Sequence, residues 1–406
     1  MNKKAFAALI GAALAGQTQV AFSQQEFTDN VIRVGVMSDM SGAYADNCGP
    51  SSVEAARIAI EEFGGNIGGT PIEIITADDQ NKPDIGVATA ARWIDREGVD
   101  TIVTCSLTPI VLATSEAMAA NKKPYMLAGS AATEATNGKC NPYTTNWAYD
   151  TYVAPRAVVE AMMAKGLDTW FFITVDLTYG KLLEEDAKRF VEAAGGKVVG
   201  FTRHPLNSTD FSGQLLEASA SGAKVIAIAN SGSDMANLVK QAQEYQVTQN
   251  GQVLAPVSML LNGVHGIGVD AAQGLTFASL GYWDQNEETR ELGKKFAERL
   301  NGRYPNEFQL ATYSAVRHYL KAVSELGSDD GEAVMAKMRQ TPVNDAFSTG
   351  VRIREDGIVA RPMHIVTVKE SAAVTQPWAY YDIQGVLSPE QVWRPQAESA
   401  CAAFAD

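Results

Sequence analysis

Short apolar segments alternate with amphipathic helical segments along the first third of the chain. Apolar residues recur at helical spacing at Val53, Ala56, Ile60 and Phe63, in the helix that follows the first such segment. The predicted buried strands are residues 31–36, 71–76, 101–104 and 124–127, and further helices are predicted at 83–97 and from Pro109 onward. Alternation of this kind predicts a parallel sheet with helices on both faces.

The same alternation restarts after a break around residues 147–152. The second set of predicted strands is 170–175, 197–201, 225–229 and 253–254, separated by helices near 181–194, 211–221 and 233–245. Two sets indicate two doubly wound parallel-sheet lobes in an α/β fold. Later helices near 287–300 and 308–326 must rejoin a lobe, so the chain is expected to cross between the lobes several times.

Ligands of open parallel sheets bind beyond the carboxyl ends of the strands. The loops expected there are 38–50, 78–82, 105–109, 128–136, 176–180 and 230–234. They are rich in Ser, Thr, Gly and Tyr. These residue types suit a small polar solute held by hydroxyls, helix-start amides and aromatic walls.

The first residues predict export from the cytoplasm. A basic head is followed by an uncharged stretch and by Ala21-Phe22-Ser23, so residues 1–23 have the pattern of a cleavable signal peptide. A membrane anchor would need roughly 20 strongly apolar residues, and Gln17, Thr18 and Gln19 interrupt this run. No lipid-attachment cysteine follows. The mature protein is therefore expected in the periplasm without direct membrane insertion.

The net charge and the cysteine spacing argue against two kinds of partner, nucleic acid and metal ions. Asp and Glu outnumber Lys and Arg by 47 to 33, giving a net charge of −14, so nucleic acid is not an expected partner. Four cysteines in an exported chain can form two disulfides in three pairings. None lies close enough to another for a metal knuckle, so no metal is expected.

Patterns typical of catalysis are missing from the sequence. The four histidines are scattered, and neither a G-x-S-x-G nucleophile motif nor a phosphate-binding P-loop occurs. Residues 266–271 match G-x-G-x-x-A, but they follow a strand interrupted by proline in an exported chain. We therefore expect neither enzymatic activity nor a cofactor.

Four segments in order carry a family resemblance. They are residues 34–42 (VGVMSDMSG), 78–83 (DDQNKP), 105–108 (CSLT) and 312–315 (TYSA). With the signal peptide, they resemble the periplasmic leucine/isoleucine/valine-binding family of ABC-importer solute-binding proteins, over nearly the whole mature chain. The resemblance implies a type I periplasmic-binding-protein fold, with two lobes joined by three hinge crossovers that close on a ligand.

The resemblance also implies where the lobes divide. Lobe 1 would comprise residues 30–148 plus 284–358, and lobe 2 residues 149–283 plus 359–406. The crossovers would fall near 147–151, 280–284 and 357–362.

Family members bind a ligand carboxylate with the first lobe. Matching positions here are Ser106 and the stretch Gly129, Ser130 and Ala131, and Thr108 is a further candidate. Aromatic residues of the cleft match Tyr179 and Tyr313, and Tyr44, Tyr149, Asp150 and Asn230 are further candidates. Each tyrosine could instead be a core residue whose hydroxyl reaches the surface.

One departure from the family affects the expected ligand. Amino-acid-binding relatives place an acidic residue of the second lobe against the ligand ammonium, but the matching residues 258–262 contain no carboxylate. A buried ammonium without an anionic partner costs several kcal/mol. Either Asp150 or Asp234 supplies the charge, or the ligand has no ammonium, which we prefer. Aromatic or aliphatic carboxylates and small amides then become candidates.

The positions of the four cysteines relative to the crossovers and cleft loops predict two disulfides. Cys140 lies just before the first crossover and Cys401 near the carboxyl terminus, so we predict that they pair. Cys48 and Cys105 lie in two cleft loops, and a second pair there would rigidify the floor of the site.

Transport is the leading functional interpretation. Closure on a small-molecule ligand would create the surface that the membrane permease subunits of an ABC importer recognise. A ligand-sensing periplasmic receptor module is the alternative, and a secreted enzyme comes third.

Overall fold

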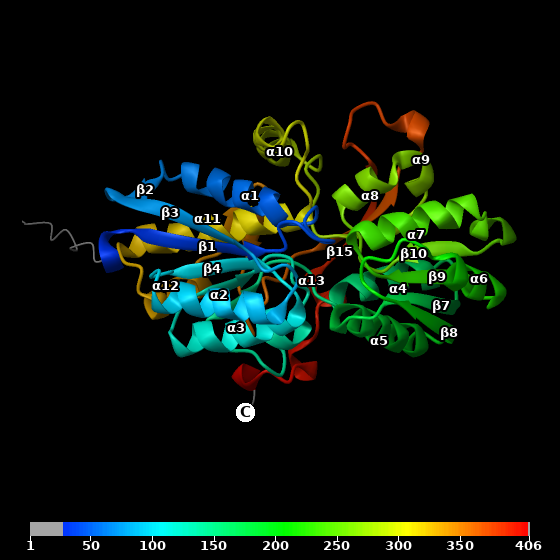
Figure 1. The fold of residues 1–406 in the computed structure, drawn as a ribbon, viewed down its shortest axis with the longest axis horizontal. Coiled ribbons are helices and arrows are strands. Elements are labelled where there is room, and N and C mark those ends of the chain that lie inside the picture. Colours follow the sequence, from blue (N-terminus) through cyan, green and yellow to red (C-terminus); the bar gives the residue numbers. More distant parts are fainter. Residues whose placement is uncertain (1–26, 405–406) are drawn as a thin grey trace, which may run out of the picture.

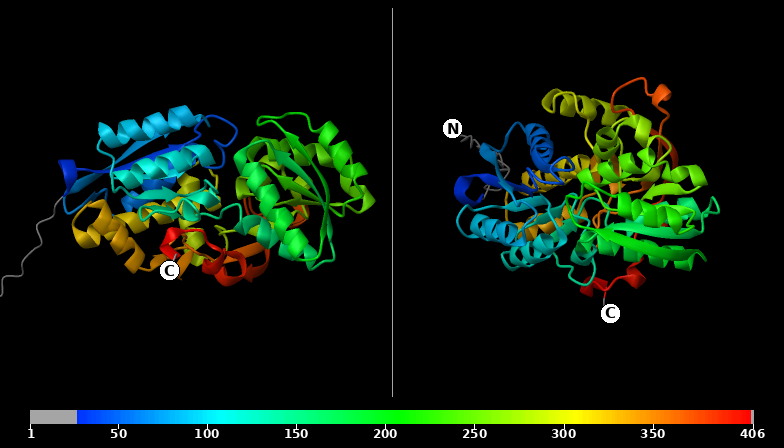
Figure 2. Two further views of the ribbon diagram at one scale, coloured as in Figure 1. Left: turned by 90° about the horizontal axis from the view of Figure 1, so that it is seen from below. Right: turned by 45° about the vertical axis from the view of Figure 1, so that its right-hand side comes forward.

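The computed structural model describes residues 27–404 and has two α/β lobes side by side (Figures 1 and 2). The predicted signal peptide lies outside the described residues. Lobe 1 is built on a six-stranded sheet in the order β2-β3-β1-β4-β5-β6, and lobe 2 on a four-stranded sheet in the order β10-β9-β7-β8. Every pairing in these sheets is parallel except β2 with β3. The predicted fold class is confirmed.

The strands of lobe 1 contain the apolar segments read from the sequence. Gly35 in the middle of β1 lets the Trp93 ring pack onto the sheet, because a Cβ there would lie 2.7 Å from a ring carbon. The strands are β1 (Ile32–Ser38), β2 (Asn66–Ile67), β3 (Thr70–Asp78), β4 (Thr101–Cys105), β5 (Tyr125–Leu127) and β6 (Thr144–Asn146). The helices are α1 (Gly49–Glu61), α2 (Pro83–Asp95), α3 (Thr108–Ala120), α10 (Glu287–Arg299), α11 (Glu307–Leu326) and α12 (Gly331–Gln340).

Lobe 2 repeats this construction. Its parallel strands are β7 (Thr169–Val175), β8 (Lys197–His204), β9 (Val225–Ala229) and β10 (Val253–Pro256). The helices are α4 (Val153–Met163), α5 (Thr178–Ala193), α6 (Ser212–Ala220), α7 (Gly232–Glu244), α8 (Leu261–Ile267) and α9 (Val269–Ala272). All residues of β9 are buried, which explains its continuous apolar sequence.

The last third of the chain adds sheets that the sequence pattern did not predict. β11 (Thr276–Ser279), β14 (Met363–Val368) and β15 (Tyr381–Leu387) form an antiparallel sheet, and β12 (Val343–Asp345) pairs with β13 (Ser348–Val351). A short helix, α13 (Pro389–Val392), follows. Most of β15 is exposed, so its sequence lacks the apolar run of a buried strand.

The chain passes between the sheets of the two lobes three times, after β6, β11 and β13. The first and third passages are paired, because Asn146 N donates to Gly357 O at 2.9 Å and Val359 N to Asn146 O at 2.9 Å. The lobe boundaries themselves stay a prediction. Near its end the tail returns to lobe 1, where Ala400 N donates to Asn137 Oδ1.

Both predicted cysteine pairs are present. Cys48 is bonded to Cys105 beside the cleft, with Cα atoms 6.3 Å apart. Cys140 is bonded to Cys401, with Cα atoms 5.5 Å apart, and joins the tail to lobe 1.

Candidate functional site

A small cavity lies between the lobes where the carboxyl ends of their strands meet. Its volume is about 40 Å³, and among the described residues that line it none carries a formal charge. The lining residues are Tyr44, Asn47, Cys105, Ser106, Leu107, Thr108, Gly129, Ser130, Tyr179, Ser231 and Phe308. We call this space the inner cavity.

Three long helices begin at the inner cavity. Thr108 is the first residue of α3, Tyr179 the second of α5, and Ser231 immediately precedes α7. None of the three has a side-chain cap on its first turn, whereas Asn286, Asn306 and Asp330 cap α10, α11 and α12. Helix N-termini carry partial positive charge and free N–H groups. The helix N-termini therefore make the inner cavity favourable for an anion, although no positively charged side chain lines it.

The floor of the cavity is a chain of hydroxyl groups in lobe 1. Thr104 Oγ1 donates to Met37 O at 2.9 Å and lies 2.6 Å from Ser106 Oγ, and Ser130 Oγ donates to Thr104 O at 3.5 Å. Thr108 Oγ1 is buried and has no hydrogen-bond partner among the described residues. A buried hydroxyl of this kind is costly unless something binds it, so Thr108 is available to a ligand.

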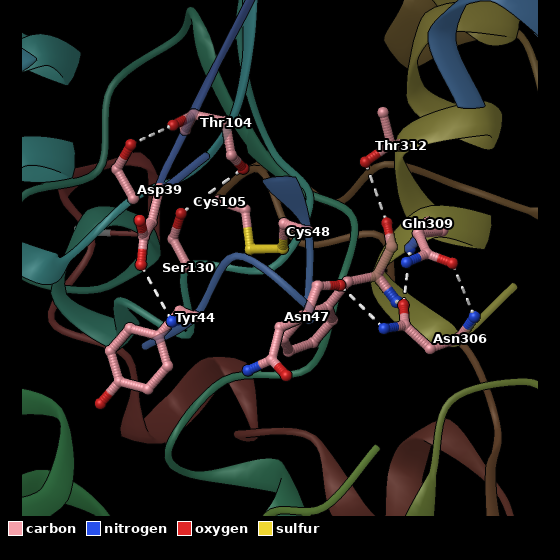
Figure 3. Close-up of a disulfide and its surroundings, with 12 residues drawn as sticks. Asp39, Tyr44, Asn47, Cys48, Thr104, Cys105, Ser130, Asn306, Gln309 and Thr312 are labelled. Atoms are coloured by element: carbon pink, nitrogen blue, oxygen red, sulfur yellow. Dashed lines mark hydrogen bonds between the residues drawn. A yellow bond between two sulfur atoms is a disulfide. The ribbon is translucent and has the colours of Figure 1, made fainter. Parts of the chain in front are cut away.

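Tyr44 and Asn47 reach the cavity from the loop that follows β1. Asp39 shapes this loop, because its carboxylate accepts the backbone N–H groups of Gly42 at 2.6 Å and Tyr44 at 2.9 Å. The Cys48–Cys105 disulfide ties the end of the loop to β4. Figure 3 shows Tyr44 and Asn47 on the same side of the disulfide. The Tyr44 hydroxyl is buried without a partner among the described residues, and burial raises its pKa.

Aromatic rings form the walls of the site. Tyr149 packs on Phe308 with ring centroids 5.2 Å apart. Ser258 Oγ lies 3.1 Å from Tyr149 OH and accepts a hydrogen bond from Tyr179 OH at 2.9 Å. Burial raises the pKa of Tyr179 to about 12, so its hydroxyl stays protonated and can donate. Within residues 258–262, where the family resemblance led us to look for a carboxylate, Ser258 thus contributes a neutral hydroxyl.

Three asparagines connect the lobes beside the cavity. Asn47 Nδ2 donates to Ser231 Oγ at 3.1 Å, and Asn262 Nδ2 donates to Asn47 Oδ1 at 2.9 Å. Asn306, the cap of α11, donates to Asn262 Oδ1 at 2.7 Å. It also donates to Asn47 O at 2.8 Å (Figure 3). Because Asn47 and Asn306 belong to lobe 1 and Ser231 and Asn262 to lobe 2, every one of these bonds except that of Asn306 to Asn47 O requires closed lobes.

The structure brings most of the predicted site residues together. Tyr44, Ser106, Thr108, Gly129, Ser130 and Tyr179 line the inner cavity. Tyr149 lies behind this lining, against Phe308 and Ser258. Ala131 is not in the lining and instead pairs with Asp150 in a short bridge.

Tyr313 does not lie at the inner cavity. Its hydroxyl donates to Glu62 Oε1 at 2.7 Å. Phe308 occupies the aromatic position instead, and five residues along a helix correspond to about 140° of rotation, so Tyr313 points to another side of α11. The family pattern found the helix, and the residue of this helix that lines the inner cavity is Phe308 rather than Tyr313.

Neither candidate carboxylate of lobe 2 lines the inner cavity. Asp150 Oδ1 accepts the N–H groups of Tyr152 and Val153 at the start of α4. Asp234 Oδ2 accepts Asn207 N at 3.2 Å, and burial raises the pKa of Asp234 to about 6. Asn230 is also outside the lining, with its amide nitrogen 3.1 Å from His204 Nε2.

Asn47, Ser231 and Phe308 are site residues that sequence reasoning missed. Asn47 and Ser231 lie within the predicted cleft loops 38–50 and 230–234, but those loops contain many polar residues and nothing local distinguishes these two. Phe308 is in the first turn of α11, for which the family pattern pointed to Tyr313 rather than to Phe308.

Glu307, next to the asparagines, is a lobe 1 carboxylate enclosed by lobe 2. Only 1% of its surface is exposed. Its oxygens accept Ser279 Oγ at 2.6 Å and Leu261 N at 3.3 Å, and burial raises its pKa to about 7. Its ionisation is therefore coupled to folding.

Replacing Glu307 with Gln is expected to change how stability depends on pH. Between its ordinary value of 4.5 and about 7, Glu307 is protonated in the folded protein and ionised in the unfolded chain. Its contribution is therefore fully present below pH 4.5, falls by on the order of 3 kcal/mol as the pH rises to 7, and is constant above. Urea unfolding of both proteins across this range measures the difference, in which other titrating groups cancel. A difference independent of pH would contradict the assignment.

Residues 27–404 contain no group of three or more His, Cys, Asp or Glu side chains that could hold a metal ion. Over the same residues, no helix combines the length and apolar character needed to cross a membrane.

Comparisons with known proteins agree with this architecture. The sequence profile of the family described as periplasmic binding protein matches residues 31–373. A periplasmic binding protein from Burkholderia mallei is 37% identical, with a TM-score of 0.88 over 92% of this chain and 99% of its own. A branched chain amino acid ABC transporter periplasmic ligand-binding protein from Burkholderia xenovorans is 34% identical, with a TM-score of 0.83 over 92% of this chain and 100% of its own.

A curated relative is more distant. Leu/Ile/Val-binding protein homolog 1 of Brucella melitensis is 23% identical over 338 residues, which cover 79% of this chain and 85% of that protein. The family profile spans most of the chain, and the two solved relatives share its fold over nearly their whole length. The chain belongs to the periplasmic binding protein family.

Proposed function

We propose that this protein is the periplasmic solute-binding component of an ABC importer and that it closes around a small organic acid without an ammonium group. The observation that carries the ligand class is the uncharged inner cavity at which α3, α5 and α7 begin. The solved relative named as an ABC transporter ligand-binding protein supports the transport role. The partners would be the membrane permease subunits of that importer.

The chemistry of the site favours the carboxylate end of such a ligand. Uncapped helix N-termini and the Thr108 and Tyr44 hydroxyls offer donors from both lobes. Tyr44, Tyr179 and Phe308 offer apolar surface for an aromatic or aliphatic body. An amino acid would also bring an ammonium, and the described lining contains no anion to compensate it, which costs several kcal/mol.

Thermal unfolding tests the ligand class. Protein freed of carried-over ligand is heated with amino acids, ammonium-free carboxylates or small amides. A ligand at about 100 times its Kd adds about 2.7 kcal/mol to the free energy of unfolding, which raises the midpoint by a few degrees. We expect a shift with carboxylates. A shift with leucine or its relatives, and none with ammonium-free acids, would contradict the proposal.

Replacing Thr108 with Val then tests the carboxylate position. The substitution keeps the shape and removes the hydroxyl, so the affinity for the acid found by unfolding is expected to fall by roughly tenfold or more, the effect of one hydrogen bond to a charged group. Calorimetric titration measures this change. Thr114→Val is the matched control, because Thr114 is buried farther along α3 and is not in the cavity lining. Equal affinities for both variants would place the carboxylate elsewhere.

A further inference from the structure

A second hollow lies between the lobes next to the inner cavity. Its volume is about 540 Å³, and we call it the outer groove. Asp46, Arg299 and Arg303 border it from lobe 1, and Gly232, Asn262 and Trp378 from lobe 2. Figure 1 shows α10 and α8, whose ends contribute to it, on opposite sides of the boundary between the lobes. The groove exists only while the lobes are closed, because both lobes form its walls.

Neutral hydrogen bonds separate the two spaces. Asn47 and Ser231 line the inner cavity, and Asn262 lines the outer groove. Asn47 is hydrogen-bonded to both Ser231 and Asn262, so the three side chains form one connected group between the two spaces. A hydrogen bond between uncharged groups is weaker than one to a charged group, so binding of a carboxylate at each end of a ligand can offset the loss of these bonds. These side chains therefore form a partition that a ligand can displace.

The size of the inner cavity requires such a displacement for all but the smallest acids. A volume of about 40 Å³ accommodates little more than ordered water, whereas sites for organic ligands are typically about 300–1,000 Å³. Together with the outer groove, the site falls within that range. A ligand anchored at the start of α3 can extend only where the side chains around the cavity can move. The partition is such a place, because only hydrogen bonds between uncharged groups hold it together.

The outer groove offers a cation to the far end of such a ligand. Arg303 is bonded to Asp46 at 2.7 Å, and both side chains are about half exposed, at 41% and 59%. Exposed ion pairs are weak, so a ligand carboxylate can replace Asp46 at Arg303. The guanidinium also lies 5.8 Å from the centroid of the Trp378 ring in lobe 2. Arg303 therefore contacts Asp46 of lobe 1 and the Trp378 ring of lobe 2, and these two contacts keep its guanidinium at the groove.

Trp378 itself is in a costly conformation. Its φ of 69° lies in the left-handed region that bulky residues rarely adopt. Its carbonyl accepts hydrogen bonds from Tyr282 OH at 3.2 Å and Trp283 Nε1 at 2.9 Å, and its ring stacks on His265 with centroids 4.0 Å apart. Backbone strain that neighbours maintain in this way is concentrated at binding sites. The indole forms a rigid aromatic wall beside Arg303.

We propose that the outer groove is the distal subsite of the ligand site and that it takes the second carboxylate of an elongated dicarboxylic acid at Arg303. The first carboxylate occupies the start of α3, and the chain between them passes the displaced Asn47 partition and lies against Trp378. This inference rests on the proposed function, because it assigns the near end of the ligand to the inner cavity.

Two matched ligand series test it by calorimetric titration of the full protein. The straight-chain monocarboxylic acids from butyrate to decanoate are compared with the dicarboxylic acids of the same lengths, from succinate to sebacate. At one or more of the longer lengths, we expect the dicarboxylic acid to bind at least about tenfold more tightly than its monocarboxylic partner, the effect of one charge-assisted hydrogen bond. Arg303→Gln should remove this preference, and Asp46→Asn should increase it by removing the competing carboxylate.

Arg290→Gln is the control, because Arg290 lies on α10, is paired with Asp284 and Glu287, and is outside the groove lining. It should keep the wild-type preference. Equal affinities of the two series at every length, or a preference that survives in Arg303→Gln, would overturn the distal subsite while leaving the proposed function intact. Failure of both series to bind, in a protein that binds an amino acid, would instead contradict the proposed function and with it this inference.

Discussion

Gly232→Ala is expected to prevent full closure of the lobes and to weaken ligand binding by about a hundredfold or more. A Cβ on Gly232 would lie 2.4 Å from Ala43 O and 3.2 Å from a ring carbon of Tyr44, both across the cleft in lobe 1. A backbone carbonyl cannot rotate away as a side-chain end can, so the lobes must separate. Separation breaks the Asn47 bonds and widens the site around the ligand. A hundredfold loss corresponds to about 2.7 kcal/mol, or two to three such hydrogen bonds.

The matched control for Gly232→Ala is Gly222→Ala. Gly222 is also in lobe 2 and has a φ of 70°, close to the 64° of Gly232, but no atom lies within 4 Å of its would-be Cβ. Both substitutions therefore introduce the same strain of about 1–2 kcal/mol, and only one obstructs closure. Titration measures the affinity, and small-angle X-ray scattering with and without the acid measures closure. A closed, tightly binding Gly232→Ala protein would show that the lobes need not approach this closely.

Arg361→Leu is expected to lower the free energy of unfolding by about 3–5 kcal/mol. Arg361 lies at the third passage between the lobes and is 1% exposed. Its guanidinium donates to Trp147 O at 2.6 Å, to Ser314 Oγ at 2.8 Å and to Ser348 Oγ at 2.7 Å. Burial lowers its pKa to about 10, so it is still charged at neutral pH. Leucine would leave these buried groups without their donor.

Arg361 also stabilises the folded protein through contacts with two aromatic rings. The guanidinium lies between the Trp147 and Phe347 rings, 5.5 Å and 4.8 Å from their centroids, and Trp147 belongs to the first passage. Urea unfolding measures the loss. Arg352→Leu is the control, because Arg352 is exposed and its bond to Gln340 O is at the surface, so a change within about 0.5 kcal/mol is expected. A loss below about 1 kcal/mol for Arg361→Leu would mean that other groups satisfy its partners.

Much of the cleft could be predicted from the sequence because its parts are local. Ser106, Thr108, Ser130 and Tyr179 each follow a buried strand, and carboxyl ends of parallel strands necessarily meet at one edge of a sheet. The same logic placed Cys48 and Cys105 in loops of one lobe, where they are bonded. The choice of an ammonium-free ligand also began with the sequence, from the missing carboxylate at residues 258–262.

Other features required the arrangement of elements in space. Asp150 and Asp234 were candidates because of their charge and loop position, yet backbone N–H groups already bind one carboxylate oxygen of each. Tyr313 and Phe308 share a helix, and only its rotation against lobe 1 decides which ring faces the inner cavity. The antiparallel sheet of β11, β14 and β15 was missed because pairing between distant segments leaves no periodic signal in an exposed strand.

By itself, then, the sequence determined that the chain forms two doubly wound lobes with a polar cleft between them. The reason is that burial of a strand or of one helix face imposes a short-range pattern on the residues of that element. Only the tertiary structure decided that Asn47 meets Ser231 and Asn262, that Gly232 meets Ala43, and that Arg303 lies over Trp378. Each of these contacts joins surfaces of different lobes. It depends on how two rigid bodies connected by three passages come together, which no local pattern of hydrophobic and polar residues records.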